Sequence, residues 1–148
     1  MTWRPLAISA FAALAVLGSS ALLQAQVAAQ RSVWTGVYTA AQADHGKQLF
    51  GENCAKCHGG GLAGMDEIPP LAGPHFMADW ETQSIADLVQ RIHNTMPLDN
   101  PGALSNASST DVVAYLMQQN GIPAGTAELP NDASMQSQIR IDPTKPGT

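Results

Sequence analysis

The chain has little cysteine, few basic residues and no long apolar run after its start, and each shortage excludes a class of protein. Only two cysteines are present, so no second pair exists to complete a structural zinc site. Lysine and arginine total 7 against 12 acidic residues and form no basic run, which argues against nucleic acid or an anionic membrane surface as a partner. No stretch reads convincingly as a strand pair and no internal repeat is present. An all-α fold is therefore expected.

The first 29 residues have the order of a secretory signal peptide. Met1–Pro5 carries one positive charge and no acid, Leu6–Leu23 is almost wholly apolar, and small residues follow. We expect cleavage after Ala29, with Ala25 as the alternative site, and export to the periplasm without stable membrane insertion. An uncleaved anchor is the competing interpretation, because about 18 apolar residues can just cross a bilayer.

Turn signals and composition divide the rest of the chain into three parts. Residues 30–39 form an arm with apolar side chains that can pack on a domain, namely Val33, Trp34, Val37 and Tyr38. Residues 40–123 form one small helical domain. Residues 124–148 are a polar tail interrupted by prolines, with one turn near Ala133–Ile139.

The first predicted helix of the domain spans about Ala40–Asn53 behind Thr39 as its N-cap. A glycine in mid-helix costs roughly 1 kcal/mol relative to alanine, so Gly46 predicts that another helix crosses closely at that point. The last core helix is expected from about Thr110 to Asn120. Its N-cap would be Ser108 or Ser109, Gly121 would end it, and the face expected to meet the first helix consists of Val112, Tyr115, Leu116 and Gln119.

A third helix and two loops are predicted between these two. Ser84 and Asp87 resemble a capping box that opens a helix reaching about Asn94. An apolar stripe at helical spacing runs along it: Ile85, Leu88, Val89 and Ile92. Glycines and prolines predict loops over 59–74 and 95–107, with a short turn of helix at His75–Trp80.

Both cysteines fall within Cys54-Ala55-Lys56-Cys57-His58, a C-x-x-C-H pattern that is the attachment signature of c-type haem. Each cysteine sulfur can add to one haem vinyl group, and His58 can then ligate the iron. A thioredoxin-like dithiol is the alternative, but it needs a βαβ setting, whereas the flanks here look helical. The pattern predicts one haem c, bound covalently through Cys54 and Cys57. A buried haem would also supply the apolar core that so small a domain lacks.

The sixth iron ligand decides the function. Met96 follows an intervening helix and precedes Pro97, which restricts its backbone and helps pre-set a ligand loop. Met77 is the weaker thioether candidate, and His93 or His75 could supply nitrogen, although we expect His93 to be solvated. A thioether raises the reduction potential and favours electron transfer, whereas an open site would bind gases or peroxide.

These motifs occur in an order that resembles the class I cytochrome c family over about Ala40–Pro123. The resemblance implies a small fold of three to four helices wrapped around one haem. It further implies that the carbonyl of Pro69, in Pro69-Pro70-Leu71-Ala72-Gly73, accepts a hydrogen bond from Nδ1 of His58. Tyr115 would pack against the first helix.

Several segments look like bacterial cytochromes c found with periplasmic quinoprotein (pyrroloquinoline quinone) dehydrogenases: Trp34–Tyr38, Asn100–Ser105 and Asn120–Gly125. The resemblance implies an electron carrier, not an enzyme, that passes electrons from such a dehydrogenase toward a terminal oxidase. With a formal charge of −5, the protein would be steered to a positive patch on its partner. The alternatives are a subunit of a periplasmic oxidoreductase complex, or a haem sensor or peroxidase-like protein with an open sixth site.

Overall fold

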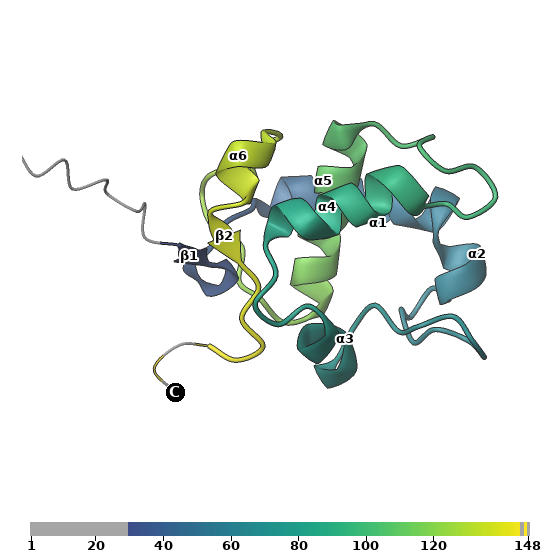
Figure 1. Ribbon diagram of the computed structural model, residues 1–148, viewed down its shortest axis with the longest axis horizontal. Helices are drawn as coiled ribbons and strands as arrows, with labels where there is room; N and C mark the ends of the chain where they lie inside the picture. The colour runs from purple at the N-terminus through teal and green to yellow at the C-terminus, as the bar shows by residue number, and fades with distance from the viewer. Residues whose placement is uncertain (1–29, 146, 148) are drawn as a thin grey trace, which may run out of the picture.

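The computed structural model describes residues 30–145 and 147, and the expected leader lies outside these residues. The described chain is mostly helical (Figure 1), in agreement with the predicted all-α class. Its elements, in order, are β1 (Arg31–Ser32), η1 (Val33–Thr35), α1 (Ala40–Asn53), α2 (Ala55–His58), α3 (Pro74–Asp79), α4 (Ile85–Thr95), α5 (Asn106–Gln119), α6 (Ala133–Gln136) and β2 (Ile139–Arg140).

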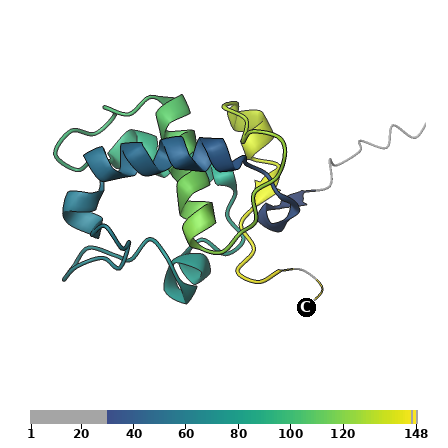
Figure 2. The same cartoon turned by 180° about the vertical axis from the view of Figure 1, so that it is seen from behind.

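Helices α1 and α5 make the most extensive helix contact, and Figure 2 shows them crossing. The predicted role of Gly46 is confirmed, because a Cβ added there would lie 1.8 Å from the carbonyl oxygen of Asp111. Beside the crossing, the rings of Phe50 and Tyr115 pack with centroids 5.4 Å apart. Gln119, expected on the same face, is exposed instead, so that part of the prediction is wrong.

Helix α4 packs on α5 through the apolar stripe expected from its sequence, since Ile85, Leu88, Val89 and Ile92 are all buried. Its predicted capping box is present in both directions. The Ser84 hydroxyl accepts from the backbone N–H of Asp87 at 3.3 Å, and the Asp87 carboxylate accepts from that of Ser84 at 2.8 Å. The box fixes where α4 begins, and therefore which face the helix turns toward the core.

The start of α5 differs from the prediction. Ser105, rather than Ser108 or Ser109, is the N-cap, and its hydroxyl accepts from the backbone N–H of Ser108 at 3.1 Å. Ser109 is fully buried and lies inside the helix, where its N–H donates to the Ser105 carbonyl at 2.8 Å. Three nearby serines offer equivalent capping groups locally, so tertiary packing selects among them.

The arm and the tail meet in a short strand pair that the sequence did not predict. β1 and β2 pair in parallel, with Arg31 opposite Ile139. The Trp34 indole N–H donates to the Asp142 carbonyl at 2.9 Å, and the Tyr38 hydroxyl donates to the Ile122 carbonyl at 2.5 Å. The arm packs on the domain as expected, although part of it is the turn η1. Together with α6, the two strands form the end of the molecule opposite α2 (Figure 1).

Candidate cofactor site

The C-x-x-C-H motif lies at the junction of α1 and α2. Cys54 ends α1, with its N–H donating to the Phe50 carbonyl at 2.9 Å, and its own carbonyl accepts from the N–H of His58 at 3.0 Å. This last bond closes one helical turn. Residues three and four apart lie on one face of a turn, so Cys54, Cys57 and His58 are presented together.

The imidazole of His58 is buried and held in one orientation. Its Nδ1 lies 3.0 Å from the carbonyl oxygen of Pro69, the contact that the family resemblance implied. A carbonyl can only accept, so Nδ1 is the donor in this contact and Nε2 takes no part in it. Nε2 is therefore the ring nitrogen that could ligate a metal.

The loop that carries Pro69 is fastened at both ends. A Cβ on Gly64 would lie 2.3 Å from the Ile68 carbonyl oxygen, and the φ of Gly64 is 72°, so this tight approach requires glycine. At the far end, the Asn120 side chain accepts from the Gly73 N–H at 2.9 Å and donates to the Leu71 carbonyl at 3.1 Å. This role of Asn120 was not predicted, and the sequence signals it only by placing Asn120 just before Gly121, the glycine that follows α5.

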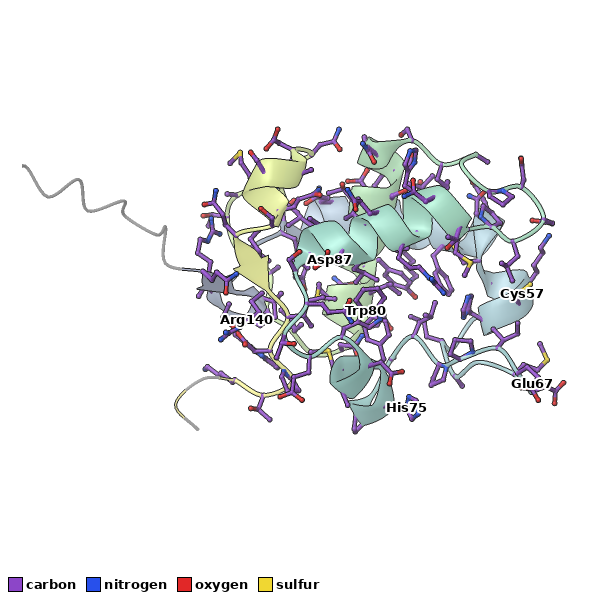
Figure 3. The ribbon with its side chains drawn as sticks, viewed as in Figure 1. Cys57, Glu67, His75, Trp80, Asp87 and Arg140 are labelled. Atoms are coloured by element: carbon purple, nitrogen blue, oxygen red, sulfur yellow. The ribbon has the colours of Figure 1, made fainter. Side chains whose placement is uncertain are left out.

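A cavity of about 1090 Å³ opens beside the motif. Cys54, Cys57, His58 and Met96 all line it. Figure 3 shows Cys57 and Trp80, both lining residues, on different elements. Apolar side chains from five segments supply much of the remaining wall: Phe50, Leu71, Phe76, Trp80, Leu88, Ile92, Val112 and Leu116. The cavity is large enough for a cofactor, and its wall suits an apolar one.

Met96 is the one methionine of the described chain that lines this cavity. Met96 is the C-cap of α4. Its N–H donates to the Ile92 carbonyl at 2.9 Å, and its own backbone conformation is extended. Met77, the weaker candidate, is buried in the core on α3 and is absent from the cavity wall. Met117 is buried within α5, while Met65 and Met135 are about half exposed.

The two histidines considered as alternative ligands do not reach the cavity wall. His93 was expected to be solvated, but this is wrong, because its Nδ1 lies 2.7 Å from the Leu104 carbonyl and the ring is half-buried. The bond ties the 96–105 loop to α4. His75 is exposed and lies beside Asp79, with Nδ1 3.0 Å from a carboxylate oxygen.

The electrostatics of the site favour uncharged sulfur. Burial, and secondly the neighbouring Cys57, raise the pKa of the Cys54 thiol to about 11, so at neutral pH it keeps its proton. At the surface, Lys56 pairs with Asp99 of the 96–105 loop. The hydrogen bond and charge of Lys56 lower the pKa of Asp99, and Asp99 in turn raises that of Lys56.

These residues fit a c-type haem. One imidazole nitrogen and one thioether line a largely apolar cavity, and such donors suit haem iron better than a hydrated hard cation. Two thiols at the spacing of the attachment motif line the same wall. In the part of the chain that the structure describes, no cluster of three or more His, Cys, Asp or Glu side chains is arranged to hold a metal ion. No helix of residues 30–145 is long and apolar enough to cross a membrane.

Comparison with known proteins identifies relatives. The family model described as "Cytochrome C oxidase, cbb3-type, subunit III" matches residues 41–116, which include the motif and Met96. Cytochrome c6 of Synechocystis sp. is 38% identical over 86 residues, which cover 54% of this chain and 68% of that protein. The solved structure of the sulfane dehydrogenase SoxCD from Paracoccus pantotrophus superposes with a TM-score of 0.48 at 23% identity. That match covers 67% of this chain and about half (52%) of the solved chain.

Proposed function

The chain belongs to the class I c-type cytochromes and is an electron-transfer protein rather than an enzyme, and on that premise we propose that it holds one covalent haem c with two protein axial ligands. Cys54 and Cys57 would form the thioether links. His58 and Met96 would ligate the iron. The observation that carries the proposal is that these four side chains, and no other methionine or histidine of the described chain, line one cavity of about 1090 Å³.

The protein's own groups prepare this site for electron transfer. When bound, haem supplies the reversible one-electron change of its iron. The Pro69 carbonyl holds the Nδ1 proton of His58, which orients the ring and makes Nε2 a stronger ligand. Apolar side chains supply much of the cavity wall, and a thioether from Met96 would favour the reduced state. The 96–105 loop is held by Lys56–Asp99 and by His93, which keeps Met96 at the cavity.

The ligand assignment is tested with Met96→Ala, using Met77→Leu as the matched control. In the proposed site, Met96→Ala removes the long-wavelength absorption band of a thioether–iron(III) bond, lowers the reduction potential and lets the ferrous form bind carbon monoxide rapidly. Met77→Leu changes a buried side chain outside the cavity and should preserve all three properties. If the band survives Met96→Ala, Met96 is not the ligand. Rapid carbon monoxide binding by the unaltered protein would favour the sensor or peroxidase-like alternative.

We further propose that the protein works in the periplasm, between a quinoprotein dehydrogenase and a terminal oxidase, and that residues 40–123 are the haem domain. The leader-like composition of residues 1–29 and the extracytoplasmic setting of covalent haem attachment support the location. N-terminal sequencing of the exported protein should begin at Gln30. Stopped-flow mixing with a purified quinoprotein dehydrogenase should show rapid haem reduction. Co-purification with a dehydrogenase at fixed stoichiometry would instead favour a subunit of a complex.

A further inference from the structure

The tail of the chain folds back onto the domain and packs against it. The family match ends at residue 116, so residues 124–142, which we name the strap, are an addition to the matched region. Four side chains spread along the strap are buried, none of them more than 3% exposed: Leu129, Gln136, Ile139 and Ile141. The strap is therefore part of the folded core, and its contacts bear on the helices beneath it.

The last part of the strap is fastened to the start of α4. β2 pairs with β1 on one side, and on its other side Arg140 pairs antiparallel with Ser84. The Ile141 N–H donates to the carbonyl of Gln83 at 2.9 Å. Because Ser84 is the N-cap of α4, the strap bonds to the residues at which this helix begins. Figure 1 shows β2 beside this end of α4.

Gln83 belongs to the wall of the cavity beside the C-x-x-C-H motif. Its N–H donates to the Trp80 carbonyl at 3.1 Å, and its side-chain amide donates to the Asp79 carbonyl at 2.9 Å. Asp79, Trp80 and Gln83 all line the cavity. The hydrogen bond from Ile141 therefore connects the strap directly to a section of the cofactor site.

Helix α4 joins this fastening point to Met96. The helix has 11 residues and is about 16 Å long at 1.5 Å per residue, with Ser84 at one end and Met96 as C-cap at the other. Hydrogen-bonded helices behave as rigid elements over such a length. A displacement of the Ser84 end is thus carried to Met96, although α2 and β2 lie at opposite ends of the molecule (Figure 1).

We propose that Ile141 is a positioning residue for the iron ligand Met96: through β2 it holds the start of α4, and detachment of β2 opens the sixth ligand position. The proposal rests on the proposed function, because it requires that Met96 ligates the iron. β2 is only two residues long and lies near the chain end, where local opening costs less free energy than global unfolding. Whatever releases the strap therefore loosens the cofactor site from its far side.

Two alanine variants of the strap separate this role from a general loss of stability. Ile141→Ala removes the buried side chain that holds β2 beside Gln83. Leu129→Ala, the matched control, removes an aliphatic side chain of the same size from the other half of the strap. Leu129 lines a second cavity, of about 410 Å³, that shares no residue with the first. Both variants should lower the urea midpoint of unfolding by similar amounts, since both lose a buried aliphatic group.

The haem distinguishes the two variants in the absence of urea, where both are folded. Ferrous protein is mixed with carbon monoxide in a stopped-flow instrument, and the reduction potential is measured separately. Carbon monoxide binds only when Met96 leaves the iron, so its rate of binding follows the population of the open state. Ile141→Ala should raise this rate roughly tenfold and lower the reduction potential. Leu129→Ala should change the rate less than about twofold and leave the potential unchanged.

A milder pair, Ile141→Val and Leu129→Val, makes the same comparison if Ile141→Ala does not fold. Ile141→Val should raise the rate roughly two- to threefold, and Leu129→Val should leave it unchanged. Equal rates in the two members of a pair, at matched urea midpoints, would overturn the proposal while leaving the haem carrier intact. Absence of the thioether–iron(III) band from the unaltered protein would instead count against the proposed function.

Discussion

Gly46→Ala is expected to destabilise the protein although alanine is the better helix former. Gly46 lies where α1 crosses α5, and the added Cβ would be 1.8 Å from the carbonyl oxygen and 2.5 Å from the carbonyl carbon of Asp111. It would also lie 3.1 Å from Cβ of Tyr115. The obstructing atoms belong mainly to the backbone, so no side-chain rotation relieves the overlap. The two helices must move apart at their closest approach.

Two opposing terms set the magnitude. Overpacking of a core costs typically 1–3 kcal/mol, and an obstruction by backbone puts Gly46→Ala near the upper end of that range. Replacing a mid-helix glycine by alanine returns about 1 kcal/mol. We therefore expect a net loss of roughly 2 kcal/mol in the free energy of unfolding. Since Leu116 of α5 lines the cavity and α1 leads into Cys54, displacement of the helices should also disturb the haem absorption spectrum.

Gly51→Ala is the matched control in the same helix. A Cβ at Gly51 would meet no atom within 4 Å, so only the propensity term applies and stability should rise by about 0.5–1 kcal/mol. Urea unfolding of the haem-loaded proteins, followed by far-ultraviolet circular dichroism and by haem absorbance, measures both variants. A Gly46→Ala variant as stable as Gly51→Ala would refute the argument from close helix contact.

Two further changes test contacts outside the haem site. Tyr38→Phe leaves the buried Ile122 carbonyl without its donor and should cost about 1–3 kcal/mol at neutral pH. Burial raises the pKa of Tyr38, so the folded protein keeps the phenolic proton to higher pH than the unfolded chain does. The unaltered protein should therefore lose stability as the pH rises above about 10. In urea titrations across that range, Tyr38→Phe should lose less stability than the unaltered protein. Ser105→Ala removes the N-cap of α5 and should lower the free energy of unfolding by about 1 kcal/mol. Ser108→Ala, the control, should lower it clearly less. A larger loss from Ser108→Ala than from Ser105→Ala would contradict the observed cap.

Local sequence was sufficient for the features whose determinants are close together in the chain. The C-x-x-C-H motif is contiguous, so one helical turn brings Cys54, Cys57 and His58 onto one face. The start of α1 at Thr39 and of α4 at Ser84 follows from side chains within one turn of each helix end. Gly46 predicted a helix crossing because glycine in mid-helix needs a compensating contact.

The tertiary structure decided what depends on segments far apart in the sequence. The intervening helix and Pro97 favoured Met96 over Met77, but only packing placed Met96 on the cavity wall and Met77 in the core. It turned His93 to the Leu104 carbonyl, and it paired β1 with β2 across the whole domain. Each of these outcomes depends on partners that come close only after the chain has folded. Local propensity therefore cannot predict these contacts. Only the packing of the folded core selects among side chains that are chemically equivalent in the sequence.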